Sequence, residues 1–133
     1  TTWTMNVVDS GRTYLVVWPD GMSVHPGYRL ERTPSYPGIA DDYRRTFARL
    51  DALQPDIWLV SHTERFDLEG KRARAAQMGA EAFIDRAGYH VYIAQQRAAF
   101  EEVLAAERAA PSAEDGVRRG MATEEERRQG RAR

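Results

Sequence analysis

The chain has no cysteine among its 133 residues. Disulfide bridges, thiolate zinc ligands and cysteine nucleophiles are therefore excluded, although the absence does not fix a cellular compartment. No run of about 18 apolar residues occurs, so the sequence offers no segment of the length that a membrane-spanning helix needs. The net charge is only -1. Proteins that bind nucleic acid or anionic membranes usually carry an excess of positive charge, so we expect neither partner.

What is present is the composition of one small globular domain, with 42% hydrophobic residues. Periodic apolar patterns run through residues 1–109. From 110 to 133 the chain is charged and poor in large apolar side chains, so it cannot bury enough surface to offset its ordering entropy. We expect a domain over 1–109 and, over 110–133, a charged tail that is disordered or forms an isolated solvated helix.

Two strand-like runs at residues 2–8 and 13–18 flank a turn and predict a β-hairpin. Trp3 and Trp18 are expected to pack in the core or on a sheet face rather than to stack on bases. Residues 19–38 follow with four prolines and three glycines and predict a long loop, a kind of segment that often carries function.

The rest of the domain alternates between helix and strand. An apolar stripe over residues 39–53 predicts a helix, which Pro55 ends, and the apolar run 57–60 predicts a short strand buried on both faces. A short helix over 71–78 and a long final helix capped by Asp85 complete an α/β layer.

His62 stands where the strand at 57–60 ends. Ligands of open α/β sheets gather beyond the carboxyl ends of the strands, so His62 is the best-placed candidate for chemistry. Glu64 or Asp67 is a candidate acceptor for a hydrogen bond from the imidazole, although Asp67 is more simply a helix cap.

The loop before the first helix supplies further candidates. Ser23, His25 and Tyr28 would lie on the same side as His62 if the two strands before them run parallel. Tyr28 is a candidate hydrogen-bond donor to a substrate. His25 is a candidate ligand, but it is more simply a surface histidine.

Several motifs, in order and with similar spacing over residues 1–107, resemble the C-terminal half of a zinc metallo-β-lactamase of the third subclass. They are PGYRL at 26–30, YPGIADDYRRTF at 36–47, LQPDI at 53–57, SH at 61–62, FDLEGKRA at 66–73 and FIDRAGY at 83–89.

This resemblance implies half of an αββα sandwich, made of a strand hairpin, a helix, a strand and further helices, with a two-zinc site at one edge. It implies that His62 is the last histidine ligand, on the second zinc. Tyr28 would lie near the substrate and help to polarise the lactam carbonyl, and Ser23 would help to hold the substrate carboxylate. The lack of cysteine fits the third subclass, although Gly21 stands where a serine is usual.

The family's His-x-His-x-Asp-His motif is absent from these residues. We expect the chain to begin just after the family's middle histidine, and hence to hold one of six zinc ligands. A catalytic zinc ion is usually bound by three protein ligands, and a single imidazole binds zinc weakly. We therefore expect the chain to be inactive alone. The missing N-terminal half would supply the other sheet, so an apolar face of this half is expected to be exposed.

The resemblance thus implies zinc-dependent β-lactam hydrolysis, and so antibiotic resistance, once the missing half is present, in a periplasmic or secreted enzyme. Two alternatives remain open at this stage. One is a hydrolase of the same fold that acts on a lactone or a thioester. The other is a non-catalytic structural or interaction module, in which His62 is only a hydrogen-bonded residue at the end of a strand.

Overall fold

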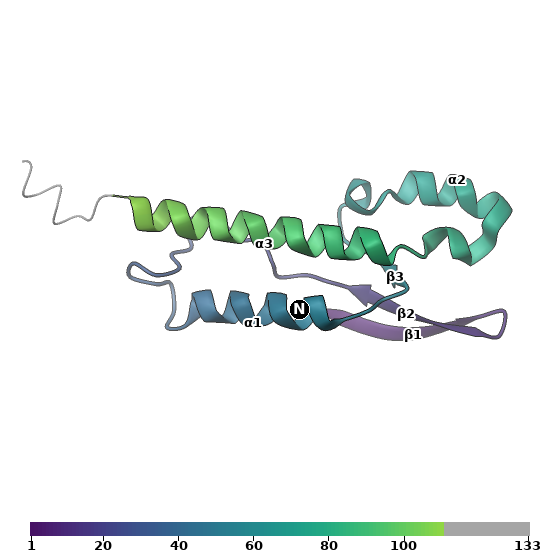
Figure 1. Ribbon diagram of the computed structural model, residues 1–133, viewed down its shortest axis with the longest axis horizontal. Coiled ribbons are helices and arrows are strands. Elements are labelled where there is room, and N and C mark those ends of the chain that lie inside the picture. The colour runs from purple at the N-terminus through teal and green to yellow at the C-terminus, as the bar shows by residue number, and fades with distance from the viewer. Residues whose placement is uncertain (111–133) are drawn as a thin grey trace, which may run out of the picture.

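The computed structural model describes residues 1–110, which form a three-stranded sheet with three α-helices and two short 3-10 helices (Figure 1). The expected tail at 110–133 lies, except for Ala110, outside the described residues. The elements in chain order are β1 (Trp3–Asp9), β2 (Arg12–Trp18), α1 (Ile39–Ala52), β3 (Ile57–Trp58), η1 (Thr63–Phe66), α2 (Leu68–Met78), η2 (Gly79–Phe83) and α3 (Arg86–Ala109).

The predicted hairpin is confirmed, and β2 forms the centre of the sheet. β1 pairs antiparallel with β2, and β3 pairs parallel with β2 on its other side. The two-residue turn holds Ser10 and Gly11 at φ 48 and 79, the left-handed region that tight hairpin turns require. Because β2 and β3 run parallel, both point their carboxyl ends at the same edge of the sheet.

The strand predicted at 57–60 is shorter than expected. It pairs with β2 only at Ile57 and Trp58, and one more hydrogen bond, from the Leu59 amide to the Val17 carbonyl at 3.0 Å, joins the two segments beyond that pairing. The expectation of burial on both faces is also wrong. Trp58 is buried, whereas Ile57 is only partly covered, because the helices pack against one face of the sheet.

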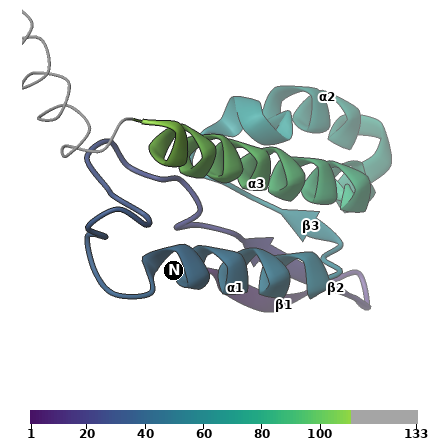
Figure 2. The ribbon, with the colours of Figure 1, turned by 60° about the vertical axis from the view of Figure 1, so that its left-hand side comes forward.

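The core lies between that face and helices α1 and α3, which run side by side in front of the strands in Figure 2. The predicted stripe of α1 is confirmed, since Phe47 and its neighbours are buried. Phe100 of α3 packs against Phe47 and Tyr43, with ring centroids 5.8 and 5.2 Å away. The Tyr89 hydroxyl donates to the Leu50 carbonyl at 2.9 Å and joins α3 to α1. Within the described residues, no helix combines the length and apolar character of a membrane span.

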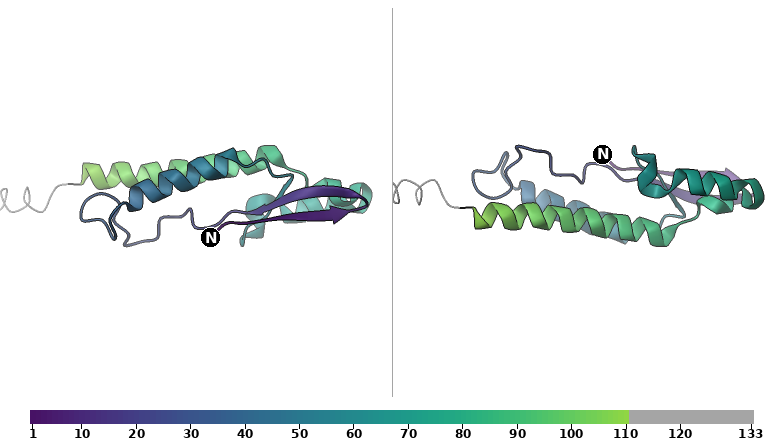
Figure 3. Two further views of the ribbon diagram at one scale, coloured as in Figure 1. Left: turned by 90° about the horizontal axis from the view of Figure 1, so that it is seen from below. Right: turned by 90° about the horizontal axis from the view of Figure 1, so that it is seen from above.

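The opposite face of the hairpin is open along β1, as the view from below in Figure 3 illustrates, whereas Tyr14 and Val16 of β2 on the same face are buried. Pairing sets Trp3 opposite Trp18, so these side chains share a face with Met5 and Val7. We call these four residues the hairpin face. They are 65% (Trp3), 50% (Met5), 41% (Val7) and 38% (Trp18) exposed. Trp3 is therefore on a sheet face and not in the core, because nothing among residues 1–110 covers it. The expected exposed apolar face is confirmed.

Candidate active site at the carboxyl ends of two parallel strands

His62 follows β3 and precedes η1, with its backbone in an extended conformation. Its side chain is 64% exposed, and its Nδ1 lies 3.5 Å from the Glu64 Oε1. Glu64 is thus the carboxylate beside the imidazole. Asp67 instead accepts from the Gly70 amide at 3.2 Å and caps α2, as its simpler interpretation predicted. At this distance, with both side chains mostly exposed, the contact stabilises the position of the ring little.

A cavity of about 220 Å³ lies at this edge of the sheet. Because β2 and β3 are parallel, the loop that follows β2 and the segment that follows β3 line it together, as predicted. Its polar lining consists of Asp20, Ser23, His25, Ser61, His62 and Arg65. Trp18, Met22, Val60 and Tyr92 contribute apolar walls. The cavity therefore brings His62 and Ser23 together, and His25 with them.

The loop around Ser23 is fixed by helices on both sides. The Tyr43 hydroxyl of α1 donates to the Ser23 carbonyl at 3.0 Å, and the Ser23 hydroxyl donates to Gln96 of α3 at 3.4 Å. Burial raises the pKa of Tyr43, so this hydroxyl keeps its proton and remains a donor. Two helices that pack in the core therefore set the position of a candidate substrate-binding residue.

Tyr28 lies next to this cavity but outside its lining. Its ring is edge-on to the ring of His25, with centroids 5.9 Å apart, and its amide donates to the His25 carbonyl at 3.1 Å. The residue is 48% exposed. Its side chain is therefore accessible from solvent, and its catalytic role stays a prediction.

The described residues do not make a complete zinc site. Among residues 1–110, no group of three or more histidine, cysteine, aspartate or glutamate side chains has the arrangement of a metal site. Catalytic zinc takes three protein ligands and an open position, and His62 supplies one imidazole. Any zinc at this edge therefore depends on donors from elsewhere.

The far end of the long loop is anchored to the end of α3. The Glu107 carboxylate accepts from three successive amides, those of Leu30, Glu31 and Arg32, at 2.7, 3.1 and 2.6 Å. The Arg32 guanidinium donates in return to the Arg108 carbonyl at 2.8 Å. The amide of Leu30, opposed by desolvation, lowers the pKa of Glu107 below its ordinary value of 4.5.

Replacing Glu107 with glutamine is expected to lower the free energy of unfolding by about 1–2 kcal/mol, after allowance for solvent screening. Because the folded-state pKa is depressed, this contribution is present above the ordinary pKa and is lost as the pH falls through the folded value. Urea denaturation at pH 7 and at low pH measures both effects. Glu102→Gln, on an exposed face of α3, is the control. An equal loss in both variants would contradict the anchoring role.

Asp20 and Arg65 are charged lining residues that the sequence did not single out. Arg65 lies in η1, three residues after His62, which precedes this 3-10 helix. The only signal for Arg65 was its nearness in sequence to a strand-end histidine, which does not show where its side chain lies until the local fold is known.

No family model matches the sequence. Similar solved structures include a metallo-β-lactamase of Cronobacter sakazakii with a HARLDQ motif, which is 43% identical, covers 82% of this chain and 42% of that chain, and has a TM-score of 0.68. Native FEZ-1 metallo-β-lactamase of Legionella gormanii is 34% identical, with 82% and 42% covered and a TM-score of 0.72. BJP-1, a subclass B3 metallo-β-lactamase of Bradyrhizobium japonicum, is 31% identical, with 81% and 40% covered and a TM-score of 0.69.

The chain spans less than half the length of each of these structures. The matches nevertheless bear out the resemblance set out above, and each covers about four fifths of this chain. In fold and in sequence, the chain belongs with the subclass B3 metallo-β-lactamases and corresponds to a part of their domain.

Proposed function

We propose that this chain, joined to the rest of the fold, forms a zinc-dependent hydrolase that opens β-lactam rings. The observation that carries the proposal is the cavity at the carboxyl ends of β2 and β3, which gathers His62 and Ser23 on a chain 31–43% identical to three metallo-β-lactamases. These neighbours support a hydrolase of the metallo-β-lactamase fold. The β-lactam substrate itself is our proposal.

The chain would contribute three groups to the completed site. His62 supplies an imidazole nitrogen to the second of two zinc ions, and Glu64 orients the ring. Tyr28 offers a hydroxyl to the oxyanion that develops on the lactam carbonyl. Ser23 offers a hydroxyl to the substrate carboxylate. When bound, zinc supplies the Lewis acid for ring opening, and its remaining ligands come from outside the described residues.

The rest of the fold is the partner that this proposal requires. The hairpin face exposes two tryptophans, a methionine and a valine on one side of the sheet, and an exposed apolar patch of this kind is typical of a surface that packs against a partner. A second sheet packed against it would bury these side chains, about 10 Å from the first sheet. We also propose export to the periplasm, in line with the resemblance.

Nitrocefin hydrolysis tests the proposal. The purified chain alone is expected to be inactive, because it has one imidazole for zinc. The same chain mixed with, or fused to, the N-terminal half of a subclass B3 enzyme is expected to hydrolyse nitrocefin, and a chelator is expected to abolish the activity. Hydrolysis by the chain alone would contradict the proposal, as would a zinc-loaded complex that cleaves a lactone or a thioester but no β-lactam.

A further inference from the structure

Tyr28 contacts the oxyanion in the proposed reaction, yet its own side chain does little to fix its position. The residue is 48% exposed, and its ring packs edge-on against the ring of His25, with the centroids 5.9 Å apart. A donor that stabilises developing charge has to be held in place before the reaction begins. The backbone on either side of Tyr28 must therefore supply most of the positioning.

The segment before Tyr28 is held by α1 and by a turn. The Tyr43 hydroxyl donates to the Ser23 carbonyl at 3.0 Å, and the Tyr28 amide donates to the His25 carbonyl at 3.1 Å. Both contacts act on the chain up to Tyr28 and not beyond it. The direction in which Tyr28 points therefore also depends on what holds the segment that follows.

That segment is closed on itself. The Ser35 amide donates to the Arg29 carbonyl at 3.0 Å, and the Arg29 amide donates to the Ser35 hydroxyl at 3.0 Å. Between them Thr33 adopts the left-handed conformation, with φ 49, which turns the chain back. We call residues 29–35 the closed loop. Because Arg29 directly follows Tyr28, any movement of the closed loop is passed to the Tyr28 backbone.

The closed loop is attached to the end of α3. Leu30 is 2% exposed and belongs to the core, and the Glu107 carboxylate accepts from the amides of Leu30, Glu31 and Arg32 at 2.7, 3.1 and 2.6 Å. Three donors that converge on one carboxylate fix the backbone of the loop relative to the helix. Leu30 is two residues after Tyr28, so about 7 Å of chain at most separates the attachment from the tyrosine.

A second contact in this region is less able to fix the backbone. Arg108 pairs with Glu31, but their side chains are 55% and 34% exposed, and such a pair can rearrange while the main chain stays in place. The partners of Glu107 are main-chain amides, which cannot leave the carboxylate unless the loop itself moves. Glu107 is therefore the residue on which the placement of the closed loop depends.

We propose that Glu107 is a positioning residue, which holds the closed loop so that Tyr28 presents its hydroxyl to the carbonyl oxygen of the lactam. The reaction that Tyr28 assists rests on the proposed function, whereas the positioning is a property of the chain itself. Glu107 lies outside the cavity lining. It can nevertheless control the rate, because a misplacement of about 1 Å in a reacting group can cost about a hundredfold.

Side-chain NMR of the three histidines, at one fixed pH, tests the positioning on the full chain. Glu107→Ala is expected to shift the ring signals of His25, because the ring of Tyr28 lies against them and moves with the closed loop. The signals of His62, which follows β3, and of His90, which lies beside Gln54, are expected to stay in place. Chemical shifts of the folded state do not respond to a loss of stability alone.

Matched variants complete this test. Glu102→Ala, on an exposed face of α3, is expected to shift none of the three histidines. Glu107→Gln keeps one oxygen acceptor and is expected to shift His25 less than Glu107→Ala does. Circular dichroism verifies folding, and Glu107→Gln takes the place of Glu107→Ala if the alanine variant does not fold. Unchanged His25 signals would overturn the proposal, and so would similar shifts of all three histidines, which indicate a general change of the fold.

The completed enzyme tests the consequence for the reaction. Glu107→Ala is expected to lower kcat for nitrocefin by about tenfold to a hundredfold, with a smaller change in KM and an unchanged zinc content. Tyr28→Phe removes the hydroxyl that Glu107 is proposed to place. Adding Glu107→Ala to Tyr28→Phe is therefore expected to cost little more, whereas fully additive losses would overturn the positioning role.

These measurements separate the inference from the proposed function. An active completed enzyme whose kcat does not respond to Glu107→Ala would refute the role of Glu107 and leave the function intact. A completed protein that hydrolyses no β-lactam, but whose His25 signals alone shift in Glu107→Ala, would refute the function. The placement of Tyr28 by Glu107 would then still hold.

Discussion

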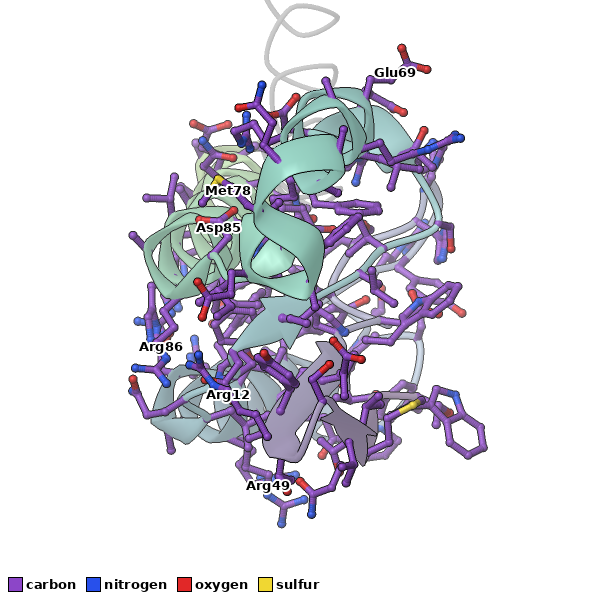
Figure 4. All side chains as sticks on the ribbon, turned by 90° about the vertical axis from the view of Figure 1, so that its right-hand side faces the viewer. Arg12, Arg49, Glu69, Met78, Asp85 and Arg86 are labelled. Atoms are coloured by element: carbon purple, nitrogen blue, oxygen red, sulfur yellow. The ribbon has the colours of Figure 1, made fainter. Side chains whose placement is uncertain are left out.

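Replacing Asp85 with alanine is expected to lower the free energy of unfolding by about 3–5 kcal/mol, because it leaves the buried ammonium group of Lys71 without its carboxylate partner. Lys71 is the only lysine of the chain, and its side chain is 3% exposed. Its Nζ lies 2.8 Å from the Asp85 Oδ2 and about 5 Å above the rings of Trp58 (5.2 Å) and Phe66 (5.5 Å). Figure 4 shows Asp85 at the start of α3, near Met78 at the end of α2.

The Asp85 carboxylate has further partners. It accepts from the Gly88 amide at 2.9 Å, which caps α3, and from the Trp58 indole at 3.3 Å. Burial alone would raise the pKa of Asp85, but the hydrogen bonds from Lys71 and Gly88 outweigh it and hold the pKa below its ordinary value of 3.8. The stabilisation is therefore present above the ordinary pKa and is lost as the pH falls through the folded value.

The Lys71→Met variant distinguishes two effects: the cost of leaving the Lys71 charge unpaired and the cost of losing its contact with Asp85. Methionine fills a similar volume without a charge, and Asp85 keeps the Gly88 and Trp58 hydrogen bonds and partial access to water. We expect a loss of about 1–2 kcal/mol, well below that of Asp85→Ala. The decisive comparison is the Lys71→Met/Asp85→Ala double variant in urea denaturation. It should be more stable than Asp85→Ala alone, and a double variant that is less stable would contradict the explanation.

This ion pair shows where sequence reasoning reached its limit. Residues 71–78 and Asp85 were correctly assigned to a helix and to a helix cap from local patterns. The contact between Lys71 and Asp85 depends on how α2 and η2 fold back onto α3, which no local period encodes. The same holds for Glu107, whose three amide partners lie at least 75 residues earlier in the chain.

Local sequence patterns did predict the strands and the helix that position the site. Gly11 and the alternation around it predicted the hairpin, and the apolar stripe of α1 predicted the helix that connects β2 to β3. His62 and Ser23 were expected on one side if the two strands run parallel. The structure shows that they do, and both residues line one cavity. The length of β3 and its burial on one face only were missed, since each depends on whether neighbouring elements are present to pair with the strand or cover the face.

In the completed enzyme, His62→Ala is expected to lower kcat/KM for nitrocefin by more than about a hundredfold, because loss of a direct metal ligand should cost more than the tenfold to hundredfold typical of its supporting residues. Bound zinc is expected to fall from about two ions per complex toward one. Metal analysis and initial rates on the same preparations measure both effects.

The two other histidines supply the controls. His90→Ala, on α3 outside the cavity, is expected to change neither zinc content nor rate. His25→Ala is more informative, because His25 lines the cavity and packs edge-on against Tyr28. Loss of His25 should disturb the position of Tyr28, and hence the rate, without loss of zinc. If His25→Ala instead released zinc and His62→Ala did not, the ligand on this edge would be His25. The resemblance on which His62 was chosen would then hold for the fold but not for the metal site.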